Sequence, residues 1–96
     1  MINVEKRDGQ VVEFDLKKIS QAITKAFKAT EKFYTDEIIG LLSLRVTSDF
    51  QSKIKDNLVH VEDIQDSVEH VLEETGYTDV AKAYILYREK RKSARE

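Results

Sequence analysis

The sequence contains no cysteine and no proline, and only three of its 96 residues are glycine. Without cysteine, a disulfide, a thiolate zinc site, an iron–sulfur cluster and a cysteine nucleophile are all excluded. So few turn-forming residues predict regular structure joined by short turns. No apolar run approaches the roughly 20 residues of a membrane-spanning helix, and the first residues lack a signal-peptide pattern. We therefore expect a cytoplasmic protein with no membrane role.

An excess of charge of either sign is also missing. The 16 Lys and Arg residues nearly balance the 18 Asp and Glu residues, which gives a formal net charge of -2. A nucleic-acid-binding domain of this size usually carries a basic excess, so we expect no nucleic-acid partner. With 41% hydrophobic residues, the chain can build one core. We predict a single domain, 1–96, cut from a longer protein because it ends in a charged helix without a stop signal.

The first 14 residues predict a β-hairpin that turns at Asp8-Gly9. A two-residue loop would place Ile2 and Val4 on the opposite face from Val12 and Phe14. A three-residue loop, 7–9, pairs Val4 with Val12 and puts all four apolar side chains on one face, with Gly9 in the left-handed conformation. The hydrophobic pattern therefore favours the three-residue loop, which also places Lys6 on the apolar face.

Four helices and one more strand follow. The cap residues Asp15 and Thr35 predict helices over 16–29 and from 36 to about 50, and Gly76 predicts the end of a third helix that begins near 61. A fourth helix follows Thr78, and 58–61 is predicted as a strand beside the hairpin. The second helix is apolar on more than one stripe, so we expect it to be buried on two sides. The fold class is α+β, a three-stranded β-sheet covered by a four-helix bundle.

Cations cluster at three places. Lys6-Arg7-Asp8-Gly9 is either a phosphate clamp at a rigid turn or a solvated hairpin tip. Lys17 and Lys18 oppose the dipole of the first helix, which favours a bound anion, although a lysine that extends into solvent costs little. Five more cations lie near the end of the last helix, where they also complement the dipole: Arg88, Lys90, Arg91, Lys92 and Arg95.

Other residues give weaker signals. Tyr77, Tyr84 and Tyr87 lie near one face of the last helix, where core packing is favoured over base stacking. His60 and His70 have no third metal ligand at a useful spacing, so we expect a helix cap or a surface position for each, and no metal site. Glycine-rich phosphate loops, catalytic triads and paired carboxylates are missing from the sequence. A nucleotide, if one binds, must therefore be held by side-chain cations, and we expect no catalytic residue.

Four motifs together resemble one family, the ATP-cone of ribonucleotide reductases, over residues 2–93. The opening is Val4-x-Lys6-Arg7-Asp8-Gly9, followed by Val12-x-Phe14-Asp15-x-x-Lys18-Ile19-x-x-Ala22-Ile23. The later motifs are Val61-Glu62-Asp63-Ile64-Gln65-Asp66-x-Val68-Glu69 and Ala81-x-Ala83-Tyr84-Ile85-x-Tyr87-Arg88.

The resemblance implies a regulatory domain of three strands and four helices that binds ATP or dATP, usually with Mg²⁺, and does not hydrolyse it. In this family ATP activates the reductase and dATP inhibits it, through the catalytic core of the parent enzyme and through cone–cone or cone–subunit contacts. By position, Lys6, Arg7, Lys18 and Lys92 would meet phosphates, and Val4, Val61 and Gln65 would surround the base and sugar. His60-Val61 departs from the Ser or Thr of many members.

The motif over 84–91 looks most like the anaerobic class of reductase, and the aerobic large subunit remains open. Two other functions compete with this interpretation. A nucleic-acid-binding module would use the basic last helix and would bind with a steep salt dependence. A purely structural helical interaction domain would bind no nucleotide and would expose an apolar patch.

Overall fold

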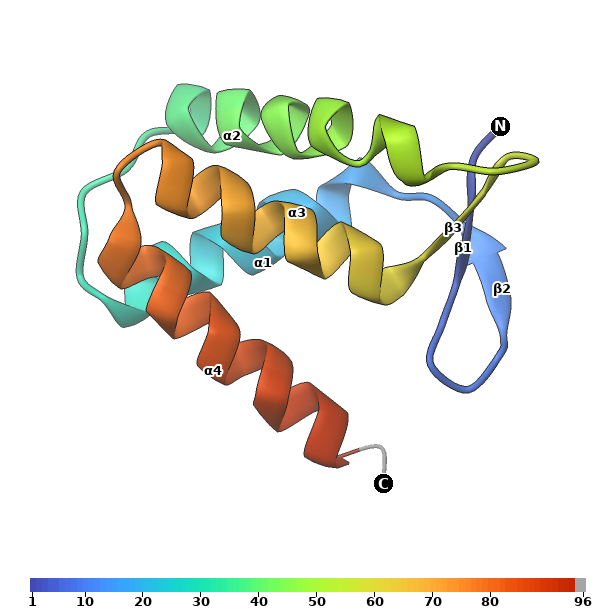
Figure 1. Ribbon diagram of the computed structural model, residues 1–96. Coiled ribbons are helices and arrows are strands. Elements are labelled where there is room, and N and C mark those ends of the chain that lie inside the picture. Colours follow the sequence, from blue (N-terminus) through green and yellow to red (C-terminus); the bar gives the residue numbers. More distant parts are fainter. Residues whose placement is uncertain (95–96) are drawn as a thin grey trace.

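The structure, a computed structural model, describes residues 1–94 as four helices and a three-stranded sheet, which confirms the α+β class (Figure 1). The predicted continuation of the last helix at Arg95 and Glu96 lies outside the described residues. The elements follow in this order: β1 (Asn3–Glu5), β2 (Val11–Glu13), α1 (Leu16–Ala29), α2 (Asp36–Asp49), the 3₁₀ turn η1 (Gln51–Lys53), β3 (Leu58–His60), α3 (Val61–Glu74) and α4 (Thr78–Ala94).

The hairpin has the predicted three-residue loop. Val4 pairs with Val12, and the Phe14 N–H donates to the Ile2 carbonyl at 2.9 Å. The loop closes where the Gly9 N–H donates to the Lys6 carbonyl, and Gly9 has a φ of 88°. This left-handed conformation is accessible to glycine at no steric cost, which is why the turn falls there.

The third strand joins the hairpin from the far side of β1. The sheet order is β2-β1-β3, with β1 antiparallel to β2 and parallel to β3. A tight turn precedes β3: Asp56 and Asn57 have φ values of 53° and 62°, in the left-handed region that these short polar residues tolerate. Val61, which we predicted as the end of the strand, is instead the first residue of α3. The sheet lies at one end of the helices (Figure 1).

Local hydrogen bonds fix where three helices begin. The Asp15 carboxylate accepts from the Lys17 N–H, and the Thr35 hydroxyl accepts from the Ile38 N–H, as the capping signals predicted. His60 Nδ1 accepts from the Glu62 N–H at 3.1 Å, so this histidine is a helix cap. Gly76, with a φ of 90°, follows the end of α3 at the position predicted for it.

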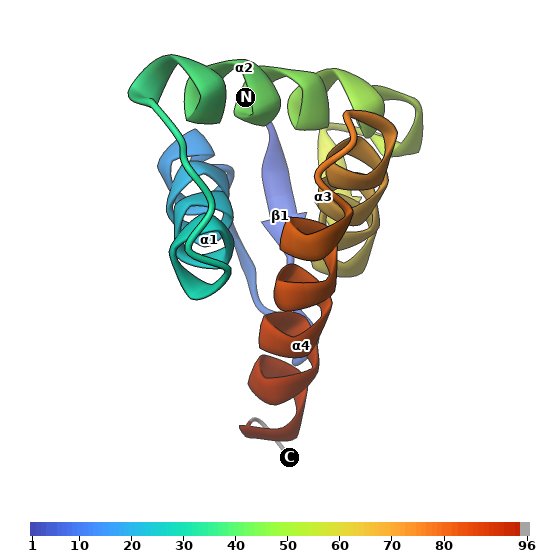
Figure 2. The same ribbon diagram turned by 90° about the vertical axis from the view of Figure 1, so that its left-hand side faces the viewer.

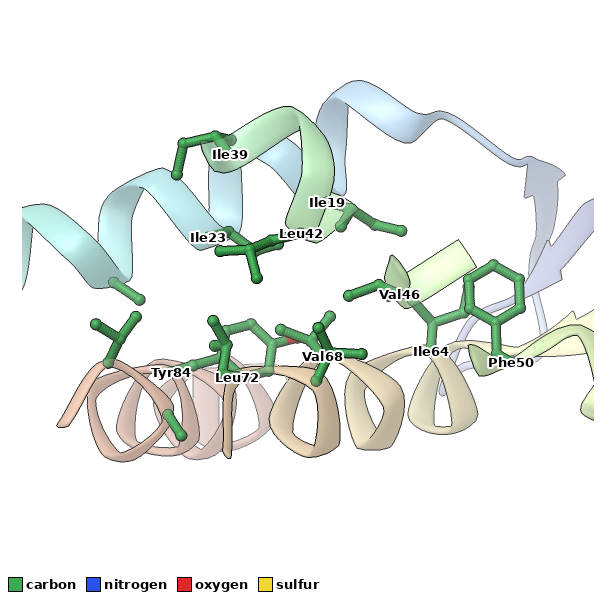
Figure 3. Packing of buried hydrophobic residues seen from close by; sticks show 14 of the residues in the cluster. Ile19, Ile23, Ile39, Leu42, Val46, Phe50, Ile64, Val68, Leu72 and Tyr84 are labelled. Atoms are coloured by element: carbon green, nitrogen blue, oxygen red, sulfur yellow. The ribbon is translucent and has the colours of Figure 1, made fainter. Parts of the chain in front are cut away.

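One hydrophobic core joins the four helices and the sheet. Helix α2 lies across α1 and α3, and α4 packs against α1 and α3 (Figure 2). In Figure 3, side chains of α1 and α2 such as Ile23 and Leu42 face side chains of α3 and α4 such as Leu72. The sheet contributes Val4 and Val59, which are both buried. This core holds the inner face of the hairpin against the helices.

The outer side of α2 is not buried, so our prediction of burial on two sides was wrong. Leu41 is 64% exposed and Leu44 is 59% exposed, whereas Leu42 and Val46 are buried. The reason is that α1 and α3 lie under the same side of α2 (Figure 2). Within residues 1–94, no helix is long and apolar enough to cross a membrane.

Candidate functional site

A cavity of about 430 Å³ opens where the sheet meets three helices. Cavities of this size hold small organic ligands. Its wall combines β1, β2 and the residues after each with α1, α3 and α4. The lining residues are Val4, Lys6, Val12, Glu13, Phe14, Asp15, Lys18, Ile19, Gln21, Ala22, Lys25, Val61, Ile64, Gln65, Val68, Tyr84, Tyr87 and Arg91.

The charged side chains on this wall are mainly cations. Lys6, Lys18, Lys25 and Arg91 line the cavity, together with two carboxylates, Glu13 and Asp15. Asp15 is already engaged as the N-cap of α1. Bringing four cations to one cavity raises their mutual repulsion, which a bound anion relieves. The wall therefore favours an anionic ligand.

Lys6 is the least exposed of these four cations. It follows β1 directly, its N–H donates to the Gln10 carbonyl at 2.8 Å, and its side chain is half-buried. The hairpin register predicted that Lys6 shares a face with Val4 and Val12, and all three residues line the cavity. A half-buried ammonium group gains from an anionic partner.

Most of the other residues on the wall are apolar. Val4 from β1 and Val61, Ile64 and Val68 from α3 supply aliphatic surface, on which a flat ring can pack. Burial raises the pKa of the nearby Tyr84 phenol well above its usual value, so this hydroxyl is neutral. One cavity thus offers both an apolar surface and a group of cations.

Two of the four cations lie against the ring of Tyr87. Lys25 Nζ is 5.8 Å from the ring centroid and the Arg91 guanidinium carbon is 6.0 Å from it. Cation–π contacts at exposed sites are worth about 0.5–1 kcal/mol, so they place both side chains without fixing them rigidly. Tyr87 therefore gathers a cation from α1 and a cation from α4 at the same edge of the cavity.

Arg7, in the hairpin turn, reaches α3. Its Nη2 donates to Gln65 Oε1 at 2.6 Å, while its Nε is buried without a hydrogen-bond partner among the described residues. Gln65 lines the cavity and Arg7 does not. The structure therefore places Arg7 behind the wall, in contact with a residue of the wall.

Arg88 has a structural position between α3 and α4. Its side chain is 13% exposed, and its Nη1 donates to Asp66 and Glu69, each at 2.8 Å. Burial works against its charge, but the hydrogen bonds to Glu69 and Asp66 outweigh this and the pKa of Arg88 is raised. Among the predicted basic cluster, this residue ties α4 to α3 and does not line the cavity.

The structure brings five of the seven predicted site residues to the cavity wall: Val4, Lys6, Lys18, Val61 and Gln65. Lys92 is exposed and does not line the cavity, whereas its neighbour Arg91 does. Lys25 and Tyr87 were not among the predicted ligands. Lys25 lies seven residues after Lys18, two helical turns along the same face of α1, and this spacing was the signal that could have found it.

The fold and the site together define a class of protein, a small α+β ligand-binding domain whose cavity suits an anion attached to a flat apolar group. The ATP-cone domain family matches residues 2–93. The chain belongs to that family.

Several reductases contain a similar segment. The ribonucleoside-diphosphate reductase subunit alpha of Chlamydia pneumoniae is 43% identical to this chain. The match covers 99% of the chain and 10% of that protein. The vitamin B12-dependent ribonucleoside-diphosphate reductase of Thermoplasma acidophilum is 44% identical over 97% of the chain and 12% of its own length. The anaerobic ribonucleoside-triphosphate reductase of Haemophilus influenzae is 38% identical, again over 97% of the chain, which covers 13% of that protein. The chain thus spans about a tenth of the length of these relatives.

Proposed function

We propose that this domain binds ATP and dATP in the cavity and regulates a ribonucleotide reductase allosterically in the cytoplasm. The observation that carries the proposal is the convergence of Lys6, Lys18 and Arg91 on one cavity that is otherwise mostly apolar. A triphosphate would contact these cations, and the base and sugar would pack near Val4, Val61 and Gln65. Lys92 stays a predicted phosphate ligand, although its neighbour Arg91 is better placed.

Hydrolysis is not part of the proposal. Lysine and arginine side chains hold phosphates by charge and hydrogen bonds, but neither positions a water molecule as a base would. The cavity carries Glu13 and Asp15 as its carboxylates, and Asp15 already caps α1. The proposed role is recognition of a nucleotide, with no catalytic residue.

A bound Mg²⁺ ion would depend mainly on the nucleotide. Within residues 1–94, no three His, Asp or Glu side chains come together as metal ligands. Mg²⁺ is commonly held by phosphates and water with only one or two carboxylates, and Glu13 is the carboxylate on the wall that is not engaged as a cap. These residues fit a metal ion that arrives with the triphosphate.

The parent enzyme is proposed only as a ribonucleotide reductase. The motif over 84–91 favours the anaerobic class, and the Haemophilus influenzae relative supports it. Relatives of two other kinds are at least as similar, with up to 44% identity, so the class stays open. Regulation, with ATP activating and dATP inhibiting, would require that the two nucleotides differ in affinity between two states of the parent enzyme. The partners would be its catalytic core and other cones or subunits.

Isothermal titration calorimetry with ATP and dATP tests the proposal. We expect both nucleotides to bind and no phosphate to be released. Lys6→Ala should weaken both about 10- to 100-fold, because a hydrogen bond to a charged group contributes about 1.5–3 kcal/mol. The matched control is Lys32→Ala, which removes an exposed lysine from the loop after α1 and should leave both affinities unchanged.

Two results would contradict the proposal. A folded domain that binds neither nucleotide at millimolar concentration would favour a structural interaction module. Binding to nucleic acid that falls steeply with salt and ignores free ATP would favour the nucleic-acid-binding alternative.

A further inference from the structure

The outer side of α2 carries a stripe of apolar side chains. Leu41 and Leu44 are each more than half exposed, and Ile38 is half-buried. Residues three apart are neighbours on the surface of a helix, so these three side chains are contiguous. In Figure 2, α2 lies across α1 and α3, and no other described element covers its outer side. A contiguous apolar stripe on an exposed helix is typical of a protein–protein contact.

A glycine lies beside this stripe. Gly40 is in the interior of α2, where glycine destabilises a helix relative to alanine. A Cβ atom added to Gly40 would meet no other atom of residues 1–94 within 4 Å. The folded domain by itself therefore does not require a glycine at this position. A second helix does benefit from it, because the distance between packed helices depends on the side chains at their contact.

The side chains on this face are arranged symmetrically about Leu41. Ile38 and Leu44 lie three residues before and after it, and Glu37 and Arg45 lie four residues before and after it. Because every residue advances a helix by the same rise, a second α2 that runs antiparallel about a two-fold axis at Leu41 brings counterparts to the same level. Ile38 is then level with Leu44 of the second copy. Glu37 is level with Arg45 of the second copy, so the face is complementary to itself in apolar residues and in charge.

Both charged residues are able to take part in such a contact. Arg45 Nη2 donates to Glu74 Oε1 at 3.1 Å, but the Arg45 side chain is still more than half exposed. A guanidinium group has five donors, so Arg45 can hold a second carboxylate as well. Glu37 is exposed, and its side chain has no hydrogen bond or ion pair within residues 1–94. Its carboxylate is therefore free to meet a cation of another molecule.

We infer that the outer side of α2 binds a second copy of this domain, in an antiparallel, two-fold symmetric helix pair centred on Leu41. One helix face on each copy is smaller than the roughly 1,200–2,000 Å² of a stable interface, so the association is weak, with a dissociation constant of about 0.1–1 mM. The inference goes beyond the proposed function, because this contact does not need a bound nucleotide.

Sedimentation equilibrium of the chain without nucleotide, from about 10 µM to about 1 mM, tests the inference. We expect a monomer at the low concentration and a dimer at the high one. Leu44→Ser should weaken the dimer at least about tenfold, because the two-fold axis removes this leucine from the interface twice. The matched control is Leu86→Ser, which removes an exposed leucine from α4 and should leave the association unchanged.

Gly40→Leu separates a specific helix pair from non-specific apolar association. The substitution adds apolar surface, and the space for its Cβ is open in the single domain. The added side chain keeps the two helices apart, so the dimer should weaken at least about tenfold. The melting temperature should rise at the same time, because leucine favours a helix more than glycine does. Non-specific association would instead become stronger.

Glu37→Arg and Arg45→Glu test the antiparallel direction of the pair. Each single change brings like charges together at two symmetric places, so each should weaken the dimer about threefold or more. The double variant again has opposite charges at both places and should regain most of the wild-type affinity. Circular dichroism of each variant verifies that the domain is folded.

Four outcomes would overturn the inference. A wild type that is monomeric at about 1 mM means that this face serves a different partner, such as the catalytic core of the parent enzyme. Association of the Gly40→Leu variant that is as tight as in the wild type means non-specific apolar contact, and so do equal losses in Leu44→Ser and Leu86→Ser. A double charge variant that is no tighter than the single ones excludes the antiparallel pair. None of these outcomes changes the calorimetry with ATP and dATP, so the proposed function fails or stands separately.

Discussion

At the scale of single residues, the direction in which a helix presents a side chain decides which cations serve the site. Arg91 and Lys92 are neighbours on α4, and successive residues of an α-helix point about 100° apart. Arg91 therefore lies over the Tyr87 ring and lines the cavity, while Lys92 is exposed and off the wall. The basic cluster at the end of the chain was visible in the sequence, but the member that faces the cavity was not.

This pair of neighbours gives a matched test. Arg91→Ala should weaken ATP binding about fivefold, since an exposed ion pair is worth at most about 1 kcal/mol. Lys92→Ala removes the same charge one residue further along and should cost less affinity than Arg91→Ala, because Lys92 does not line the cavity. Equal losses in the two variants, measured by calorimetry, would show that net charge at the end of α4 matters and that contact does not.

At the scale of helices and strands, the elements that depend on neighbouring residues were predictable. Asp15 and Thr35 cap their helices through bonds that span only two or three residues, and the Gly9 turn follows from the hairpin pattern. The predicted burial of Leu41 and Leu44 was wrong, because both are exposed. Apolar periodicity shows which faces of a helix are apolar, but it does not show which of them a neighbouring element covers. The contact of Arg7 with Gln65 joins residues 58 apart, and no local pattern predicts such a pair.

One exposed cluster joins α2 to α3 and predicts that the stability of the domain depends on pH. His70 Nδ1 lies 3.0 Å from Asp49 Oδ1, and its Nε2 lies 3.4 Å from Glu74 Oε2. The hydrogen bond to Asp49, with the charge of that carboxylate, raises the pKa of His70 above its usual 6.5. Protonation is therefore more favourable in the folded state than in the unfolded state.

The sign of the pH effect follows from linkage. A raised pKa in the folded state stabilises the domain fully below pH about 6.5, and this stabilisation is lost as the pH rises through the folded pKa. The urea midpoint should thus fall between pH 6 and pH 8 in the wild type. Both His70→Gln and Asp49→Asn should flatten that fall. A fall that is just as steep in either variant would assign the pH dependence to other groups.

At the scale of the whole molecule, all elements share one core. A substitution in this core should therefore lower the stability of the whole domain, which unfolds in one cooperative transition. Ile23 is fully buried, and Ile23→Val should cost about 0.5–1.5 kcal/mol of unfolding free energy. The control is Leu41→Ala on the outer side of α2, which should change this free energy by less than about 0.5 kcal/mol. Chemical denaturation measures both, and a large loss in the Leu41 variant would mean that this side is covered in solution.

The cavity wall runs from Val4 to Arg91, and this arrangement has a consequence for the heat resistance of the domain. A ligand held by residues from nearly both ends of the chain has no binding site once the chain unfolds, so binding energy adds directly to folding energy. At a concentration 100 times its dissociation constant, such a ligand contributes about 2.7 kcal/mol. For a domain of this length the melting temperature would rise by about 10–20 °C. Domains with bound nucleotide would then resist heat and proteolysis longer than domains without it. The fraction of the domain that stays folded would therefore report the nucleotide concentration.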